Sequence, residues 1–84
     1  MNRPEVYALI DDERAFQAAK WDGPHSWGQG DCSSTLVPPI VKAAVLTEET
    51  GEVVRAVLDV EREDQLRREL VQVAAVAVAW LESL

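Results

Sequence analysis

The stretch LTEETGEVVRAVLDVEREDQLRRELVQVAAVAVAW, residues 46–80, decides the fold. Apart from its charged residues it is built mostly from Val, Leu and Ala, which cover a wide face at helical spacing on both sides of EREDQ, residues 61–65. Valine also suits strands, but apolar patterns of about twenty residues without internal turn signals favour helices. We therefore predict helices over 40–60 and 64–83, with Asp64 as the N-cap of the second.

The N-terminal part of the chain adds a third helix and a loop. Pro4 suits a first helical turn, and apolar residues recur near helical spacing up to residue 20, which predicts a helix over 4–20. The following stretch, WDGPHSWGQGDCSSTLVPP at 21–39, is rich in Gly and Pro and is predicted to be a long loop. Loops of this length in a small domain are often functional. The sequence thus indicates one all-α domain, residues 1–84, with three helices.

Chain length favours self-association. A domain of 84 residues buries only roughly 60% of its unfolded surface. From Leu70 onward the last predicted helix is apolar nearly all round, and such a helix is normally buried on every side. Two further helices from the same small chain cannot surround it. We therefore expect a homo-oligomer in which three-helix protomers assemble into a helical bundle.

Net charge and cysteine usage restrict the partners and the compartment. A formal charge of −7 argues against a nucleic acid polymer as partner, because such binding depends on Lys and Arg. The longest apolar run, residues 73–81, is about half of the ~20 residues needed to cross a bilayer, so no membrane association is expected. The single Cys32 excludes an intrachain disulfide, and the chain does not begin with a basic segment and an apolar run. These features favour a cytoplasmic protein.

Four residues form a candidate metal site. Glu49 and Glu52 lie three positions apart on one helical face, and Glu69 and Gln72 repeat that spacing on the next helix. In an antiparallel hairpin the two pairs come opposite each other, and three carboxylates with one amide oxygen suit Mg²⁺, or Mn²⁺. Gly51 would leave room there for a close neighbour or a ligand. The alternative interpretation is an ordinary solvated face of charged residues.

These residues resemble a known family. EETGE at 48–52 followed by RELVQ at 68–72 is similar to the EExxE and ExxD signature of MazG-like nucleoside triphosphate pyrophosphohydrolases. The flanking AVLTEETGEVVRAV at 44–57 and AKWDGPHSW at 19–27 resemble that family too. The resemblance implies an all-α fold, a homodimer or homotetramer, and Mg²⁺-dependent hydrolysis of a nucleoside triphosphate to nucleoside monophosphate and pyrophosphate, as in nucleotide-pool housecleaning.

One position departs from the family pattern. Glu49, Glu52 and Glu69 match its metal-binding acids, whereas Gln72 stands where the family has Asp. A neutral ligand is compatible with weaker metal binding, with one ion instead of two, or with no catalysis. The alternative function is therefore a catalytically silent MazG-like helical protein that acts as a regulatory or interaction module. A helical assembly module without any ligand is a third interpretation.

The expected reaction also needs a base and contacts to the nucleotide. Glu48, which matches the first acid of the signature, or Glu49 would accept the proton of the attacking water. Lys42 lies seven residues before Glu49, hence on nearly the same face, and either reaches the outer phosphates or is simply solvated. Lys20 and Trp21 resemble a Lys-Trp pair near the nucleotide in similar proteins. Trp21 either stacks on the base or plugs the end of the first helix.

Overall fold

A computed structural model describes residues 1–60 and 62–84 of the chain. Glu61, in the predicted turn at 61–65, lies outside the described residues. Three helices, α1 (Arg3–Lys20), α2 (Pro39–Leu58) and α3 (Glu63–Glu82), are accompanied by two-residue strands β1 (Pro24–His25) and β2 (Gly28–Gln29). The prediction of three helices is confirmed, and each predicted boundary lies within two residues of the observed one.

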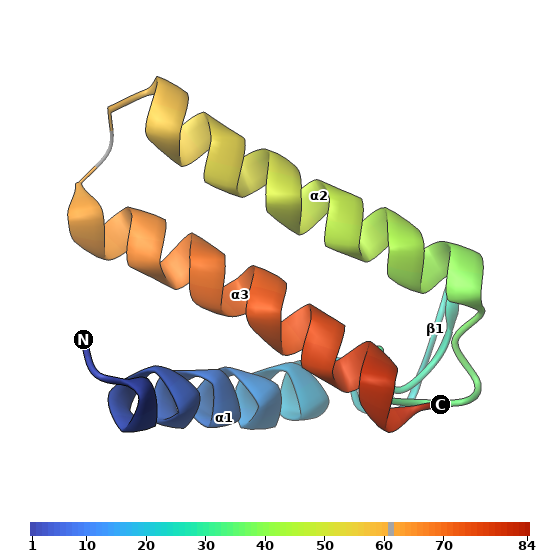
Figure 1. Cartoon of the computed structure of the whole chain (residues 1–84). Helices are drawn as coiled ribbons and strands as arrows, with labels where there is room; N and C mark the ends of the chain where they lie inside the picture. The colour runs from blue at the N-terminus through green and yellow to red at the C-terminus, as the bar shows by residue number, and fades with distance from the viewer. Residues whose placement is uncertain (61) are drawn as a thin grey trace.

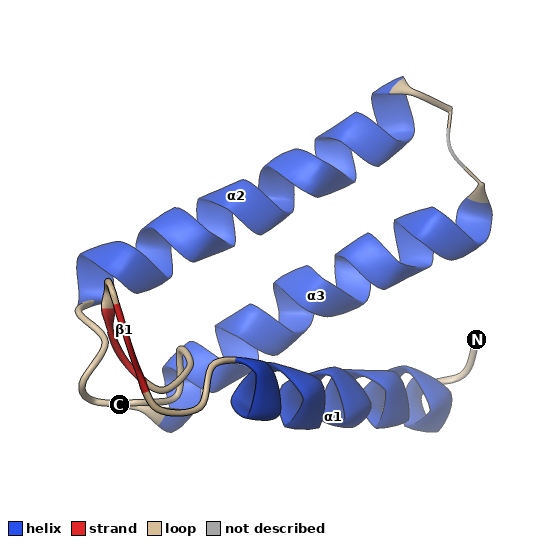
Figure 2. Cartoon of the chain, turned by 180° about the vertical axis from the view of Figure 1, so that it is seen from behind, coloured by secondary structure: helices blue, strands red, loops and turns tan. Residues whose placement is uncertain are grey.

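The helix α3 is the central element. It runs antiparallel to α2 on one side and packs against α1 on the other, as the two opposite views show (Figures 1 and 2). In the part of the chain that the structure describes, the backbones of α1 and α2 do not approach each other closely. Residues of α1 and α2 therefore face each other across α3, and this arrangement positions the candidate site.

The start of α1 has a side-chain cap, whereas the start of α3 has none. The side chain of Asn2 accepts a hydrogen bond from the backbone nitrogen of Glu5 at 2.9 Å and so caps α1. The prediction of Asp64 as N-cap of α3 is wrong, because Arg62 occupies that position. Asp64 instead lies in the first turn and accepts a hydrogen bond from Nη2 of Arg62 at 2.9 Å. A carboxylate there still stabilises the helix through the helix dipole, so the acidic signal marks the helix start without marking the cap.

The predicted loop contains a small hairpin. Pro24 pairs with Gln29 and His25 with Gly28, in an antiparallel register that the Gly- and Pro-rich composition did not indicate. Gly28 has a φ of 147°, and an added Cβ there would collide with the carbonyl oxygen of Leu36. Only glycine fits this close approach of the hairpin to the segment before α2.

One arginine ties the loop to the helices. Arg14 on α1 donates from Nη1 to Oδ2 of Asp31 at 2.7 Å and from Nη2 to Oε2 of Glu82 at 3.0 Å. The side chains of Arg14 and Asp31 are only 11% and 6% exposed. Charge-assisted hydrogen bonds of this kind are among the stronger polar contacts in proteins. The loop is thus fixed to α1 and to the end of α3.

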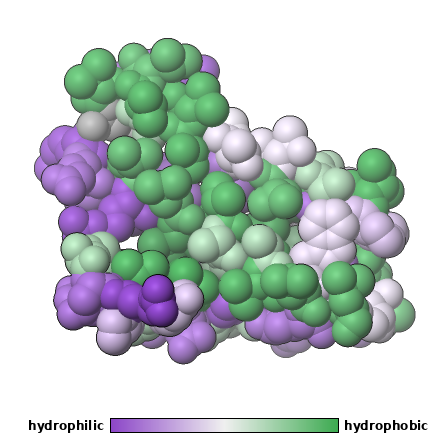
Figure 3. Space-filling view, in the orientation of Figure 1, coloured by the Kyte–Doolittle hydropathy of each residue, from purple (hydrophilic) through white to green (hydrophobic). Residues whose placement is uncertain are grey.

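The apolar core of the single chain is small. Among the described residues, five apolar side chains are buried, and three of them are alanines; they are Val37, Ala56, Ala75, Val76 and Ala79. Larger apolar side chains remain exposed at the C-terminal end of α2, where Val57, Leu58 and Val60 expose 59%, 73% and 88% of their surface. Figure 3 shows hydrophobic side chains gathered over this end of α2. None of the helices described here has the length and apolarity that crossing a membrane requires.

Candidate metal centre and cleft

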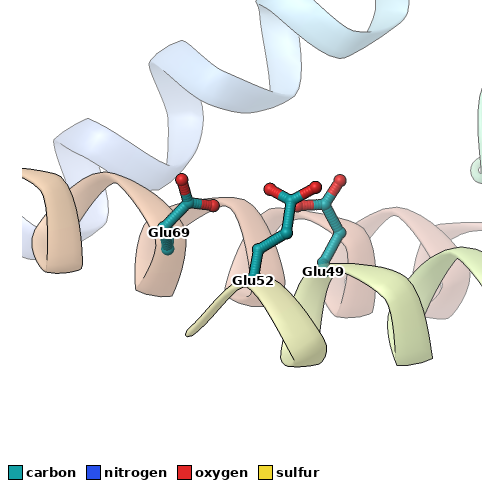
Figure 4. Close-up of side chains that lie close together, drawn as sticks. All are labelled: Glu49, Glu52 and Glu69. Atoms are coloured by element: carbon teal, nitrogen blue, oxygen red, sulfur yellow. The ribbon is translucent and has the colours of Figure 1, made fainter. Parts of the chain in front are cut away.

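Three glutamates from two helices converge on one point. Glu49 and Glu52 extend from α2 and Glu69 from α3, and one carboxylate oxygen of each lies within 4.8 Å of the other two. Figure 4 shows the two α2 carboxylates side by side, with Glu69 at the same level on the neighbouring helix. The spacing in the sequence and the antiparallel hairpin together produce this three-glutamate cluster, as the i, i+3 pattern predicted.

The close approach changes the acidity of the cluster. Burial raises the pKa of Glu49 to about 6, and repulsion by Glu52 and Glu69 adds to the shift. A hydrogen bond to Glu69 raises the pKa of Glu52 as well. The raised pKa values mean that the negative charges of the cluster are held at a cost in free energy. Either protons or a cation can reduce that cost.

Gln72 faces the cluster with its amide group. A carbonyl oxygen directed at the two nearest carboxylates would meet only acceptors, so the amide nitrogen is assigned to that side. In this orientation it donates to Oε2 of Glu49 at 3.0 Å and to Oε2 of Glu69 at 3.1 Å. Gln72 therefore lies where the sequence placed it, between the acids of α2 and α3.

A second glutamine, which the sequence reasoning missed, holds Glu69 from the opposite direction. Nε2 of Gln65 donates to Oε1 of Glu69 at 2.6 Å. The oxygen of the same amide accepts a hydrogen bond from Nη2 of Arg68 at 2.5 Å. Gln65 precedes Glu69 by four residues on α3, and this i, i+4 spacing is the signal that could have identified it.

A cleft of about 490 Å³ connects the acids with the aromatic residues of the loop. The α2 wall contributes Glu48, Glu49 and Glu52, and α3 contributes Gln72 and Val76. Opposite them, the end of α1 and the loop supply Lys20 and three aromatic rings, Trp21, His25 and Trp27. Most of the predicted catalytic, metal and substrate residues thus line one cavity, with the buried Glu69 behind it.

The aromatic part of the cleft is organised around Trp21. Its ring meets the ring of His25 edge-on, with centroids 5.6 Å apart and planes at 72°. The ammonium of Lys20 lies 5.5 Å from the centre of the same ring. Nε2 of His25 is 2.7 Å from the carbonyl oxygen of Gly30, which fixes the imidazole. Among the described residues that line the cleft, Lys20 is the only Lys or Arg.

Two expectations about neighbouring residues need correction. The ammonium of Lys42 does not point toward the acids, because it is buried and donates to Oγ of Ser83 at 2.7 Å, at the C-terminal end of α3. Lys42 neutralises that helix end instead of lining the cleft. Gly51 is exposed, and a Cβ added there would meet nothing within 4 Å, so no close neighbour in this protomer requires glycine.

Three residues of α1 enter the cleft without having been predicted. They are Glu13, Phe16 and Gln17, which share one face of the helix. Glu13 is close enough for its charge to contribute to the raised pKa of Glu49. Whether these side chains reach the cleft depends on how α1 is rotated about its own axis where it packs on α3. No motif in the sequence of α1 carries that information.

The donor set of the cluster fits a hard divalent cation. Carboxylate oxygens are the ligands that Mg²⁺ and Mn²⁺ prefer. One oxygen from each of the three carboxylates lies within 4.8 Å of the others, so the residues present fit such an ion.

Comparison of this chain with protein-family models, with curated proteins and with solved structures gave no match.

Proposed function

We propose that this protein hydrolyses a nucleoside triphosphate to the nucleoside monophosphate and pyrophosphate in a Mg²⁺-dependent reaction, as its resemblance to MazG-like enzymes implies. The observation that supports this most is the single cleft that contains both acidic and aromatic groups. Glu49 and Glu52 line it beside Gln72, and Trp21 lines it together with Lys20. Cation ligands and a surface for a base therefore face the same cavity.

The charge of the cleft explains why a cation would be needed. A triphosphate is an anion, and the cleft offers it one lysine against several carboxylates. Mg²⁺, or Mn²⁺ in its place, would be held by Glu49, Glu52 and Glu69, and when bound it would neutralise the phosphates and stabilise the departing pyrophosphate. Gln72 would offer its amide oxygen as the fourth ligand.

The protein groups would bind and orient the nucleotide. Trp21 offers a large aromatic face for stacking on the base, and the edge-on contact with His25 holds that ring in place. Lys20 carries the positive charge available to the outer phosphates. Phe16 and Val76 add apolar surface to the cleft.

The reaction itself requires one proton acceptor. The oxygen of a water molecule attacks the α-phosphorus, the bond from this phosphorus to the bridging oxygen breaks, and pyrophosphate leaves with the electron pair. Glu48 or Glu49 would accept the proton of the water. Both line the cleft.

Isotope labelling tests this reaction directly. Hydrolysis in H₂¹⁸O with Mg²⁺ should place ¹⁸O in the nucleoside monophosphate and leave the pyrophosphate unlabelled. Label in the pyrophosphate would show attack at the β-phosphorus, and release of orthophosphate from the triphosphate would show a different bond cleavage. Either result would reject the proposed reaction.

A catalytically silent MazG-like protein, acting as a regulatory or interaction module, is the second candidate function. The observation in its favour is Gln72, whose amide nitrogen bridges Glu49 and Glu69 and compensates part of their charge. Such a protein would bind nucleotide or a partner without turnover. Nucleotide binding by calorimetry, with no pyrophosphate formed at saturating Mg²⁺, would favour this candidate.

We also propose that the chain forms a homodimer or homotetramer. The core of one protomer is small, and the apolar side chains Val57, Leu58 and Val60 are exposed together at one end of α2. A second copy would cover them. Light scattering should give at least twice the 9.3 kDa of the chain. Leu58→Lys should shift the mass toward the monomer, whereas the exposed Asp11→Lys on α1 should not.

A further inference from the structure

We propose that two glutamine amides control the cation site: Gln65 fixes Glu69, and the amide of Gln72 turns over when a cation binds. This inference rests on the proposed function only in assuming that the cluster binds a divalent cation. It concerns the residues of this chain that hold the cluster together, and one of them, Gln65, is outside the EETGE and RELVQ segments.

Both oxygens of Glu69 are engaged by amide donors. Oε1 accepts from Nε2 of Gln65 at 2.6 Å, and Oε2 accepts from Nε2 of Gln72 at 3.1 Å. Glu69 is 8% exposed, so water does not compete freely with these contacts. A buried carboxylate needs such donors, because an uncompensated one is costly in free energy. The two glutamines therefore hold this carboxylate from both sides along α3, in addition to its hydrogen bond with Glu52.

The two contacts differ in what a cation would do to them. Gln65 approaches from the N-terminal direction of α3 and is itself held by Arg68, whose Nη2 donates to Oε1 of Gln65 at 2.5 Å. This contact matches the orientation in which the amide nitrogen of Gln65 faces Glu69. Gln65 can thus keep its hydrogen bond while the other oxygen of Glu69 contacts a cation. It acts as a positioning residue, comparable to the outer partners that orient metal ligands.

Gln72 cannot keep its contacts in the same way. Its amide nitrogen donates to Glu49 and Glu69 together, at 3.0 and 3.1 Å, and so it occupies the space between two ligands. A nitrogen bearing two hydrogens repels a cation, whereas the oxygen of the same amide attracts it. Rotation of the Gln72 amide by half a turn places its oxygen where its nitrogen was. Coordination of a cation by the Gln72 oxygen would therefore break these two hydrogen bonds and reverse the amide.

This exchange has two consequences for the site. Without a cation, the amide holds the carboxylates of α2 and α3 together and preserves the arrangement of the ligands. With a cation, the two lost hydrogen bonds reduce the net affinity. An aspartate at this position would not hold the carboxylates together in the empty site, because it has no N–H group to donate. For the same reason it would lose no hydrogen bonds when a cation binds. Gln72 thus makes the cluster stable when empty and keeps its affinity for the cation moderate.

Side-chain NMR of the full chain tests the exchange. The NH₂ signals of both glutamines can be assigned because Gln65→Met and Gln72→Met each remove one pair. In EDTA, both NH₂ groups should exchange with water at least about tenfold more slowly than that of the exposed Gln29. At saturating Mg²⁺, Gln72 should lose this protection and Gln65 should keep it.

The outcomes separate this inference from the proposed function. If the NH₂ group of Gln72 exchanges with water in EDTA as fast as that of Gln29, the inference is overturned whether or not a metal binds. Calorimetric Mg²⁺ binding that leaves the Gln72 signals unchanged would overturn the exchange. Absence of both Mg²⁺ and Mn²⁺ binding, with protected amides, would refute the proposed metal site and the exchange with it.

Calorimetry with Mg²⁺ alone tests the positioning role of Gln65. Gln65→Met should lower the affinity about 10- to 100-fold, as loss of an outer partner does in known metal sites. The matched control Gln29→Met should leave the affinity unchanged. In Gln65→Met the Gln72 signals in EDTA should also shift, since Glu69 is no longer fixed. Unchanged affinity together with unchanged signals would refute the role of Gln65.

Discussion

Glu49 on α2 and Glu69 on α3 bring carboxylate oxygens within 4.8 Å of each other, although they belong to different helices. Two carboxylates at this separation in a half-buried site repel each other. The chain keeps them together through the packing of α2 on α3 and through the bridging amide of Gln72. This relationship underlies most of the predictions that follow.

The first prediction concerns the ligands. Glu49→Gln, Glu52→Gln and Glu69→Gln should each lower Mg²⁺ affinity about ten- to a hundredfold, because each removes a charge from the site. Without metal the variants should unfold at the same or a higher temperature than the wild type at pH 7, since repulsion is relieved. Asp11→Asn makes the same charge change on the exposed side of α1 and serves as the control. Wild-type affinity in all three variants would eliminate the site.

The second prediction is a pH dependence set by Glu49. Burial and neighbouring carboxylates raise its pKa from an ordinary 4.5 to about 6 in the folded protein. Between these two values the unfolded chain loses the proton while the folded chain keeps it, so the free energy of unfolding should fall as pH rises. Urea unfolding in EDTA from pH 4.5 to 7 measures this. Glu49→Gln should flatten the profile, and an equally steep profile in that variant would count against this assignment.

Over the same range Mg²⁺ should bind more tightly as the pH rises. Protons and the cation compete for the Glu49 carboxylate, and above about pH 6 the proton is largely gone. Calorimetry in two buffers of different ionisation enthalpy should detect proton release on binding at pH 6. Binding without proton release at that pH would argue against Glu49 as a ligand.

The third prediction concerns the contact that fixes the loop. Burial raises the pKa of Asp31, but hydrogen bonds from Ser33 and Arg14 outweigh it, and the net value is below the ordinary 3.8. The stability that this group contributes is fully present above about pH 4 and is lost as pH falls through the lowered pKa. Asp31→Ala should cost about 2–3 kcal/mol at pH 7, because it removes the partner of a largely buried guanidinium.

Acid unfolding of the Asp31 variant provides the check. Between pH 4 and pH 2 its stability should change less than that of the wild type, since the group that would be protonated is absent. The exposed Asp11→Ala should lose stability in parallel with the wild type. Identical acid profiles for Asp31→Ala and wild type would remove the support for a loop held by this ion pair.

The fourth prediction uses Gly51 to probe assembly. Glycine inside a helix costs about 1 kcal/mol relative to alanine, and a Cβ here meets nothing within 4 Å of the protomer. Gly51→Ala should therefore stabilise the chain by about 1 kcal/mol in urea unfolding. If a second copy approaches α2 at this point, the same substitution should weaken the oligomer in light scattering. A destabilised variant whose mass is unchanged would contradict both expectations.

The sequence contained enough information for the helices and for the convergence of the acids. The i, i+3 spacing of Glu49 and Glu52 fixes a shared helical face, and a short connection between two helices makes them antiparallel. The sequence did not predict the direction in which the Lys42 side chain points. Its position on α2 was compatible with the acidic face, but its long side chain turns toward Ser83 at the end of α3. Side-chain direction of this kind depends on tertiary packing.

The loop and α1 were predicted least well for the same reason. The hairpin of β1 and β2 has only two residue pairs, which is too short for any alternation pattern to indicate it. Glu13 reaches the cleft only because α1 packs on α3 with one particular rotation. Neither feature follows from local preferences. Gln65, in contrast, was within reach of the sequence, since its i, i+4 relation to Glu69 required only the helix.

Pyrophosphate release across a Mg²⁺ titration, with all common ribo- and deoxyribonucleoside triphosphates, tests the central claim most directly. The wild type should release pyrophosphate from at least one of them, and Gln72→Asp should need about ten- to a hundredfold less Mg²⁺ for half-maximal rate, because the fourth ligand regains its charge. Glu69→Gln should need about ten- to a hundredfold more Mg²⁺ than the wild type for half-maximal rate, because it removes a charge from the site. No release by the wild type at saturating Mg²⁺ or Mn²⁺ with any nucleotide would contradict the proposed function.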